Sequence, residues 1–589
     1  MKFLKYTLAT IVGVIIASAI IFFIFLGIVG SMISSGEKET VSISPKTILV
    51  MKLDQTIKER TSANPLQNFD FKRFESQTAL GLNDILLNIR KAKDDENIKG
   101  IFLDLGVIPA GINTIEEIRN ALLDFRKSGK FVVAYADYYT QPAYYLATAS
   151  NKIYLNPAGK LLFLGLKSQI TFIKGTLDKL GLEPEIIRHG KFKSAVEPLM
   201  MDKMSKENRE QVMVYISSIW NHLLEGISAQ RKVSIPALNH LADNMTIDDA
   251  QSAASHKLVD GTKYKDQVFD ELAKLSGQPN ADKLNFVNLD KYDNVPMPRK
   301  ERHVLKNKIA IIYAQGDIVL GEGDDDNIGS EKYAKAIREA RKDTSIKAIV
   351  LRVNSGGGDA LASEIIWREV FLAKKAKPVI ASMGDVAASG GYYILAASDC
   401  IVAGPNTITG SIGVFGILMN TQKFFNKKLG VTFDVAKTNP HADLGTIARP
   451  LTAQEKEVVQ ASVERTYDDF ISHVAQGRHK TKAQIDKIGQ GRVWSGVNAK
   501  SLGLIDQFGG INKAVEIAAQ KAKLKNYRIV AYPKLIDPFT QLFNSLTSSV
   551  ESKFMKNNLA DSYQYYENIQ KIINTQGIRA QIPYSIELY

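Results

Sequence analysis

The chain has 589 residues, of which 45% are hydrophobic and 23% charged, and its formal net charge at pH 7 is +13. This length predicts about two to four globular domains, and the composition excludes a disordered chain. The basic residues are spread along the chain without a run or an aromatic-interleaved cluster, so we expect no nucleic-acid binding. A single cysteine, Cys400, excludes an intramolecular disulfide and a CxxC metal site.

The N-terminal segment is predicted to be a membrane anchor. From Tyr6 to Gly36 no residue is charged and most are apolar. A helix needs about 20 apolar residues to span a bilayer, so this run is long enough. The small residues 17–19, where a cleaved signal peptide could end, lie in the middle of the apolar run, so we expect the anchor to be retained. Lys2 and Lys5 precede the run, and the positive-inside rule then places the N-terminus in the cytoplasm and the rest of the chain outside it.

The chain repeats itself beyond the anchor. Residues 144–150, Tyr-Tyr-Leu-Ala-Thr-Ala-Ser, recur at 392–398 as Tyr-Tyr-Ile-Leu-Ala-Ala-Ser, and the apolar run 98–103 recurs at 346–351. Two shorter matches keep nearly the same spacing. Self-similarity at one spacing indicates a tandem duplication.

Short β-branched runs alternate with helical stretches in each copy. In the second copy we predict strands and helices in turn at 309–313, 331–342, 348–353, 360–375 and 379–382. This alternation is typical of βαβ units that form a mostly parallel sheet, so the predicted fold class is α/β. Longer helices are predicted at 207–230 and 455–476.

These patterns divide the chain into five predicted parts. In order they are a cytoplasmic stub with the anchor (1–36), a first α/β repeat (37–276), a proline-containing linker (277–302), a second α/β repeat (303–532) and a C-terminal helical extension (533–589).

The two copies differ at the ends of two strands. After a strand that ends at Val353, residues 354–358 read Asn-Ser-Gly-Gly-Gly, and consecutive glycines let backbone N–H groups approach a ligand closely. After the next strand comes Ser389, on a turn that opens a helix, where unpaired N–H donors suit an oxyanion. The first copy has Pro109 and Gln141 at these places.

Each feature alone is explained by a tight turn or a helix N-cap. Together, at the carboxyl edge of one parallel sheet, they indicate a ligand-binding crevice. A serine nucleophile also needs a base, yet no histidine lies in a recognisable Ser-His-Asp motif and no Gly-x-Ser-x-Gly elbow surrounds Ser389. A lysine whose pKa is lowered by burial is the alternative.

These segments resemble a known family. The glycine-rich run 354–358, the run Ala-Ala-Ser-Gly-Gly-Tyr-Tyr at 387–393 and Thr-Gly-Ser-Ile-Gly at 409–413 resemble the signal peptide peptidase A family, in its long protease IV type. So does the segment 190–198, Gly-Lys-Phe-Lys-Ser-Ala-Val-Glu-Pro. The resemblance covers nearly the whole chain, including the duplication and the anchor, and implies tandem units of the Clp/crotonase-like fold.

The resemblance also implies a Ser-Lys dyad, with Ser389 as the nucleophile and Lys193 as the general base. It implies an oxyanion hole formed by backbone N–H groups of Gly390 and of the glycine loop, with Gly358 preferred over Gly357. The chain departs from the family pattern at the glycine before Gly357, where the family usually has proline.

Ser411 is a rival nucleophile because it too is flanked by glycine. Only Ser389 follows a pair of small residues and opens a helix, so we interpret Thr409 and Ser411 as lining the site. The positions of the second copy that are equivalent to Lys193 hold histidine and alanine. Each copy therefore supplies one half of the predicted dyad, and the site must form between the copies.

The function implied is that of a serine endopeptidase in the bacterial inner membrane, anchored through residues 6–36. Its implied substrates are released signal peptides and other membrane-associated polypeptides; no metal or cofactor is needed. The resemblance further implies a homo-oligomer, a tetramer. Two alternatives stay open: a crotonase-like acyl-CoA enzyme, which a serine-reactive acylating probe would distinguish, and a non-catalytic scaffold, which a peptide-hydrolysis assay would distinguish.

Overall fold

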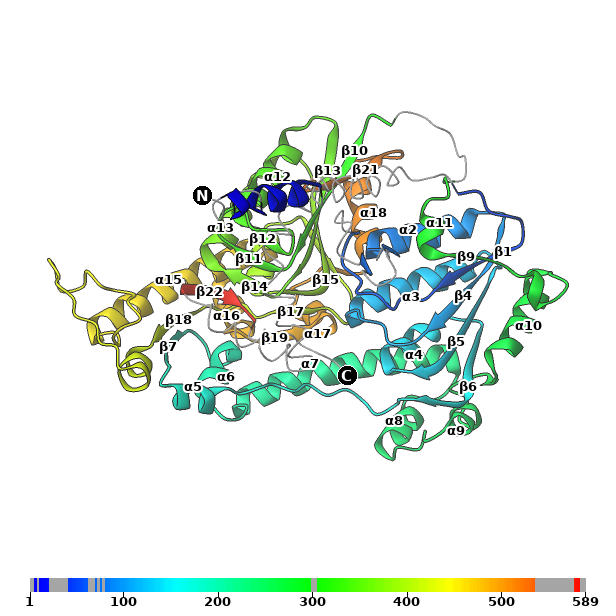
Figure 1. The fold of residues 1–589 in the computed structure, drawn as a ribbon, viewed down its shortest axis with the longest axis horizontal. Helices are drawn as coiled ribbons and strands as arrows, with labels where there is room; N and C mark the ends of the chain where they lie inside the picture. The colour runs from blue at the N-terminus through cyan, green and yellow to red at the C-terminus, as the bar shows by residue number, and fades with distance from the viewer. Residues whose placement is uncertain are drawn as a thin grey trace.

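The computed structural model describes residues 5–7, 10–20, 41–61, 69–70, 75–76, 80–297, 305–534 and 577–582. Two mostly parallel sheets, one from each half of the chain, stand side by side with helices around them (Figure 1).

The first sheet has the strand order β8-β6-β5-β4-β1-β9, and all its strands run parallel. Its strands are β1 (Thr47–Met51), β4 (Ile98–Leu105), β5 (Phe131–Tyr139), β6 (Lys152–Leu161), β8 (Gly261–Thr262) and β9 (Asn285–Asn288).

The second sheet has the order β19-β17-β15-β13-β10-β21, with β16 paired to β15 and to β20. Its strands are β10 (Lys308–Gln315), β13 (Ile346–Ser355), β15 (Val379–Ala388), β16 (Cys400–Ala403), β17 (Ile408–Gly410), β19 (Val493–Ser495), β20 (Gln507–Phe508) and β21 (Arg528–Tyr532).

The two sheets share one topology. The parallel path β9-β1-β4-β5-β6-β8 of the first corresponds strand for strand to β21-β10-β13-β15-β16-β20 of the second. Even an irregularity is repeated, since the register shifts directly after Thr47 in β1 and directly after Lys308 in β10. The predicted α/β class and tandem duplication are therefore confirmed.

A third sheet joins the repeats, in the order β12-β11-β14-β22-β18-β7. Its strands are β7 (Glu183–Arg188), β11 (Asp317–Val319), β12 (Asn327–Gly329), β14 (Gly357–Asp359), β18 (Phe415–Asn420) and β22 (Gly577–Gln581). Strand β7 of the first repeat pairs antiparallel with β18 of the second, so this sheet brings the two repeats together.

The helices cover the sheets and fill the space between them (Figure 1). In the first repeat they are α2 (Leu82–Asp94), α3 (Ile112–Arg126), α4 (Gln141–Ala147), α5 (Lys174–Leu180), α6 (Glu197–Met200), α7 (Lys206–Arg231), α8 (Ile235–Asp243), α9 (Ala250–Ser255), α10 (Lys265–Ser276) and α11 (Leu289–Asp293). In the second they are α12 (Ser330–Lys342), α13 (Ala360–Ala376), α14 (Gly390–Leu395), α15 (Ala453–Arg478), α16 (Lys482–Ile488), α17 (Gly496–Ser501) and α18 (Ile511–Lys521).

One apolar core is shared by both repeats. Leu49 and Ile101 of the first sheet belong to the same buried cluster as Ile311 and Val350 of the second. The second sheet is also buried on its other face, where Ile312 lies in a separate cluster. Strands buried on both faces need a nearly continuous apolar sequence, which explains the runs seen in β10 and β13.

Two segments predicted to lie outside the α/β repeats, the linker and the C-terminal extension, each contain a β-strand. Within the predicted linker 277–302, β9 pairs with β1, so the first sheet continues to residue 288. Of the predicted helical extension 533–589, residues 535–576 lie outside the described residues, whereas Gly577–Gln581 forms strand β22.

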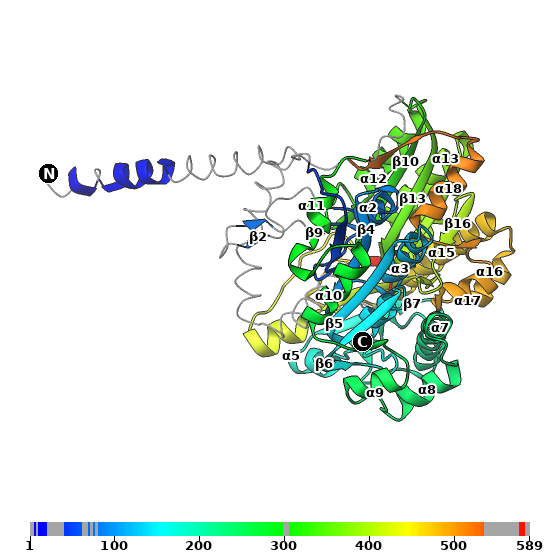
Figure 2. The ribbon, with the colours of Figure 1, turned by 90° about the vertical axis from the view of Figure 1, so that its right-hand side faces the viewer.

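The predicted anchor, residues 6–36, is described only in part. Residues 10–20 are helical, carry exposed apolar side chains such as Ile11, Val14 and Ile15, and lie away from both sheets (Figure 2). Residues 21–36 lie outside the described residues. Within the described part of the chain, no helix has the length and apolar character needed to cross a membrane.

Candidate active site

Ser389 lies between the end of β15 and the start of α14. Its backbone has φ 55° and ψ −118°, a conformation that residues other than glycine rarely adopt. The surroundings hold it there, because its N–H donates to the carbonyl of Gly410 at 2.9 Å and its carbonyl accepts from the N–H of Tyr393 at 2.8 Å. The side chain is fully buried.

Lys193 reaches the same place from the first repeat. It lies in the loop after β7, and the pairing of β7 with β18 places this loop beside the second repeat. A backbone hydrogen bond holds the loop there, since Phe192 N–H donates to the Gln490 carbonyl at 3.1 Å. Gly491 lies so close that a Cβ atom on it would be 2.6 Å from the Lys193 Cα atom.

The structure brings the two predicted dyad residues together. Lys193 Nζ lies 2.8 Å from Ser389 Oγ, and both side chains are buried, with 1% and 0% of their surface exposed. Burial holds the pKa of Lys193 well below that of an ordinary lysine. A neutral amine within hydrogen-bonding distance of a serine hydroxyl can accept its proton.

Ser411 and Thr409 differ in how they approach this pair. Lys193 Nζ donates to Ser411 Oγ at 3.1 Å and to the Ser411 carbonyl at 3.2 Å. Thr409 Oγ1 instead donates to the carbonyl of Ala387 at 2.7 Å, near the end of the strand that carries Ser389. Ser411 thus positions the amine, and Thr409 fixes the end of β15.

The glycine loop lies against Gly390, the first residue of α14. A Cβ atom on Gly357, whose φ is +99°, would be 2.7 Å from the Gly390 nitrogen. Gly357 N–H donates to Ser355 Oγ at 3.1 Å, whereas Gly358 pairs with Ile318 of β11. Of the two glycines proposed for an oxyanion hole, the structure places Gly357 in contact with Gly390.

Comparison with known proteins identifies the family. The model of Peptidase family S49 matches residues 124–278 and 372–525, one region in each repeat. The "Protease 4" of Salmonella typhi is 38% identical over 551 residues, which cover 90% of this chain and 88% of that protein. The "Protease 4" of Haemophilus influenzae is 35% identical over 519 residues, covering 84% and 83%.

The chain belongs to peptidase family S49. It is a serine protease, and its homologues include the chloroplastic "Serine protease SPPA" of Arabidopsis thaliana, 36% identical over 476 residues that cover 80% of this chain and 70% of that protein. The long protease IV type of the family, predicted from the motifs, is confirmed.

Among solved structures, a ClpP1 mutant from Listeria monocytogenes is 15% identical and covers 36% of this chain and 95% of its own, with a TM-score of 0.24. A score this low supports no assignment, so the Clp/crotonase-like fold stays a prediction.

In this S49 peptidase, Gln211 of α7 is a site residue that the sequence did not reveal. Its side-chain amide nitrogen donates to Ser194 Oγ at 2.8 Å and to the Phe192 carbonyl at 3.2 Å. Its oxygen accepts from the N–H of Val493 at 3.1 Å, in the second repeat. Gln211 therefore ties the Lys193 loop to both repeats, and no local sequence signal distinguishes it from other helical glutamines.

A second connection fixes the strand that carries Ser389. Asp385 of β15 accepts from the N–H and the hydroxyl of Thr114, at 2.8 and 2.6 Å, in the first turn of α3. A Cβ atom on Gly111, the residue before α3, would be 2.1 Å from the Asp385 carboxyl carbon. A residue of the second repeat therefore caps a helix of the first.

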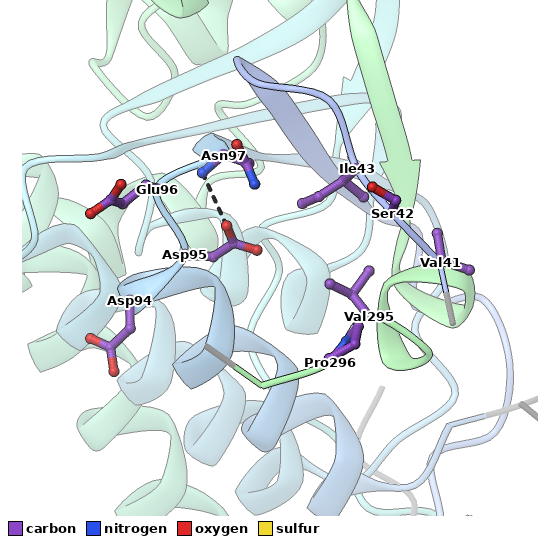
Figure 3. A pocket seen from close by; sticks show the side chains of 9 residues that line it. All are labelled: Val41, Ser42, Ile43, Asp94, Asp95, Glu96, Asn97, Val295 and Pro296. Atoms are coloured by element: carbon purple, nitrogen blue, oxygen red, sulfur yellow. Dashed lines mark hydrogen bonds between the residues drawn. The ribbon is translucent and has the colours of Figure 1, made fainter. Parts of the chain in front are cut away.

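A cavity of about 480 Å³ lies elsewhere, in the first repeat (Figure 3). It is lined by residues 41–43, 94–97, Val295 and Pro296. None of the predicted site residues is among them, and the acidic side chains there offer no paired base and nucleophile. This cavity does not mark the catalytic site.

Proposed function

We propose that this serine protease is an endopeptidase whose dyad consists of Ser389 and Lys193, one from each repeat. The observation that carries the proposal is the 2.8 Å contact between Lys193 Nζ and Ser389 Oγ in a buried site. Burial supplies the lowered lysine pKa that a base requires.

The geometry supports an acyl-enzyme mechanism. Neutral Lys193 accepts the Ser389 proton while Oγ attacks the peptide carbonyl, and the carbonyl electron pair moves to the oxygen. The protonated amine then gives its proton to the leaving nitrogen as the C–N bond breaks. Water, deprotonated by the same lysine, hydrolyses the ester and restores the serine hydroxyl.

Backbone N–H groups beside Ser389 are proposed to stabilise the oxyanion. Gly390 follows the nucleophile, and Gly357 lies against it, with Gly358 next in the chain. We propose Gly390 and Gly357 as donors, with Gly358 as the alternative; the Gly357 N–H, which donates to Ser355 Oγ at 3.1 Å, would then have to turn to the oxyanion. Each such donor contributes about 3–4 kcal/mol of transition-state stabilisation.

The substrates and location follow from relatives and from the N-terminus. A "Putative signal peptide peptidase SppA" of Enterococcus faecium is 31% identical over 232 residues. We propose that this chain also degrades released signal peptides and other membrane-associated polypeptides. Residues 6–36 are proposed to anchor it in the bacterial inner membrane, with a cytoplasmic N-terminus, as part of a homo-oligomer; the exposed apolar side chains of residues 10–20 support the anchor.

Hydrolysis of a fluorogenic peptide by the full chain tests the proposal. Ser389→Ala and Lys193→Met should each abolish hydrolysis, whereas Lys191→Met is a matched control because Lys191 is an exposed lysine of the same loop. Ser411→Ala should retain part of the activity. Full activity in Ser389→Ala or in Lys193→Met would overturn the dyad.

A further inference from the structure

Arg492, the residue before β19, lies between two aromatic rings, one from each repeat. Its guanidinium carbon is 4.6 Å from the centroid of the Phe192 ring and 4.5 Å from that of the Trp494 ring. Both distances are within the range of about 6 Å over which a cation is attracted to an aromatic face. The guanidinium also donates at 2.8 Å to Glu210 of α7, the helix that passes beside β19 (Figure 1).

The first ring belongs to the residue that directly precedes Lys193. The Phe192 backbone is held on both sides, since its N–H donates to the Gln490 carbonyl at 3.1 Å and its carbonyl accepts from Ser194 N–H at 2.7 Å. These hydrogen bonds leave the direction of the side chain open, and the contact with Arg492 fixes it. The whole of Phe192 is therefore held against the second repeat.

The second ring supports the strand end beside the nucleophile. A Cβ atom on Gly410 would be 2.8 Å from Trp494 Cδ1, so the ring lies against the Gly410 backbone. The Gly410 carbonyl accepts the N–H of Ser389 at 2.9 Å. The ring is itself held, because Trp494 Nε1–H donates to the Ile488 carbonyl at 3.0 Å. The guanidinium of Arg492 thus joins the surroundings of the lysine to those of the serine.

The backbone beside Arg492 also contacts the base. The Arg492 carbonyl accepts the N–H of Ser411 at 2.7 Å, and Ser411 accepts from Lys193 Nζ through its hydroxyl and its carbonyl. Gly491 lies against the Lys193 Cα atom. Because burial lowers the pKa of Lys193, a separation of its loop from residues 489–492 would admit water and weaken the lysine as a base.

We propose that Arg492 is a positioning residue, which packs its guanidinium between Phe192 and Trp494 and so holds the Lys193 loop against the Ser389 strand and keeps water from the amine. Arg492 acts through the two rings rather than on the reacting atoms. This inference rests on the proposed function, since it takes Lys193 and Ser389 as the dyad.

The kinetics of peptide hydrolysis test the positioning role. Arg492→Ala should lower kcat by about 10- to 100-fold with little change in KM, as a small displacement of reacting groups does. The midpoint of the kcat/KM pH profile should rise by about one pH unit, because water at the amine brings the pKa of Lys193 closer to its ordinary value. The matched control, Arg368→Ala, removes an exposed arginine 5.5 Å from the Phe371 ring centroid and should change neither the rate nor the profile.

Two further variants separate packing from charge. The other charged groups beside the loop stay in place: Arg188 donates to the Lys193 carbonyl at 3.4 Å, and His189 pairs with Glu464. Arg492→Met fills the space between the rings without a charge and should keep a midpoint close to that of the wild type. Arg492→Lys keeps the charge but loses the flat guanidinium and should raise the midpoint as Arg492→Ala does. The reverse order of these two variants would overturn the proposal, because charge would then be what acts on the amine.

Chemical modification measures the shielding without relying on activity. In the wild-type chain treated with acetic anhydride, mass spectrometry should find Lys191 acetylated and Lys193 unmodified, because Lys191 is exposed and Lys193 is buried. Arg492→Ala should be acetylated at both lysines, and circular dichroism checks that it is folded. Arg492→Lys serves in its place if it is not.

The outcomes separate the two proposals. Full activity of Lys193→Met would overturn the proposed function, and the acetylation pattern would still test whether Arg492 shields the amine. If the wild-type chain is active and Lys193→Met is not, an unchanged kcat and pH profile in Arg492→Ala would overturn the positioning role alone. Protection of Lys193 from acetylation in folded Arg492→Ala would overturn it as well.

Discussion

At the scale of single residues, the site combines a strained serine with a buried amine. Ser389 is held at φ 55° by the strand before it and the helix after it, and such strain costs about 1–3 kcal/mol. Lys193 is held in a site where its charged form is disfavoured. The backbone strain at Ser389 and the unfavourable burial of the Lys193 amine are both offset by the stability of the rest of the fold, which is typical of a catalytic centre.

The strain at Ser389 predicts an unusual stability ranking. Ser389→Gly should be more stable than Ser389→Ala by about 1 kcal/mol, because glycine adopts this conformation without a Cβ clash. Thermal unfolding of the two variants measures this difference. The matched control is Ser363, buried in helix α13, where glycine should instead be less stable than alanine by about 1 kcal/mol. The same ranking at both positions would contradict the strain.

The lowered pKa of Lys193 predicts a pH profile. We expect kcat/KM to rise with pH as the amine loses its proton, with a midpoint well below the value of about 10.4 for a free lysine. Because folding lowers this pKa, the unfolded chain binds more protons between the two pKa values, so the free energy of unfolding also rises with pH in that window. Lys193→Met should remove this contribution. A rate that is flat or falls with rising pH would contradict a lysine base.

At the scale of elements, the site depends on strand ends that meet. The strands and helices of each repeat could be predicted because their apolar alternation is local, and β10, α12, β13, α13 and β15 match the predicted order. The third sheet could not, because β7 and β18 are distant in sequence and no local pattern records their pairing.

In the candidate site, too, some residues could be predicted from the sequence and others could not. Ser389 and Lys193, which the structure brings together, could be predicted because the copies differ there and the motifs resemble a family. Gln211 and Gly491 were missed because their roles arise from contacts between the repeats. The contact of Gly357, rather than Gly358, with Gly390 also required the structure, since two adjacent glycines look alike in sequence.

The glycine loop predicts a steric effect on catalysis. A Cβ atom at Gly357 would lie 2.7 Å from the Gly390 nitrogen, so Gly357→Ala should close the oxyanion site. We expect kcat to fall by about 10²–10³, the loss typical of one oxyanion donor. The control is Gly106→Ala, where nothing lies within 4 Å of the added atom and activity should persist. Equal activities of the two variants would contradict the loop's role.

At the scale of the whole molecule, the two repeats are joined by a buried ion cluster. Arg352 of β13 donates to Glu59 at 2.8 Å and to Glu117 at 2.7 Å, and both carboxylates come from the first repeat. Burial raises the pKa of Glu59, and the charge of Arg352 opposes that rise. Glu117 also accepts from the N–H of Ile511 at 2.9 Å.

This cluster predicts that the repeats depend on each other for stability. Arg352→Met should cost about 3–5 kcal/mol of unfolding free energy, because it leaves buried carboxylates without their cation. Arg338→Met should cost about 1 kcal/mol or less, since Arg338 is half-exposed in its pair with Glu369. Chemical denaturation of both variants checks the contrast, and a loss below about 1 kcal/mol in Arg352→Met would contradict a stabilising role of the Arg352 cluster.

The duplication explains why the molecule needs this connection. In the proposed dyad one repeat carries the hydroxyl and the other the amine, so catalysis by it requires a fixed relation between the two sheets. The β7–β18 pairing, the Asp385 cap on α3 and the Arg352 cluster each join residues from both repeats.

Labelling by a serine-reactive acylating probe, followed by peptide mapping by mass spectrometry, tests most directly whether an amine of the first repeat activates a hydroxyl of the second. The wild-type chain and Lys191→Met should carry one adduct, on Ser389, and Lys193→Met should carry none. Labelling of Ser389 in Lys193→Met at the wild-type rate, or an adduct on Ser411 instead, would contradict the dyad.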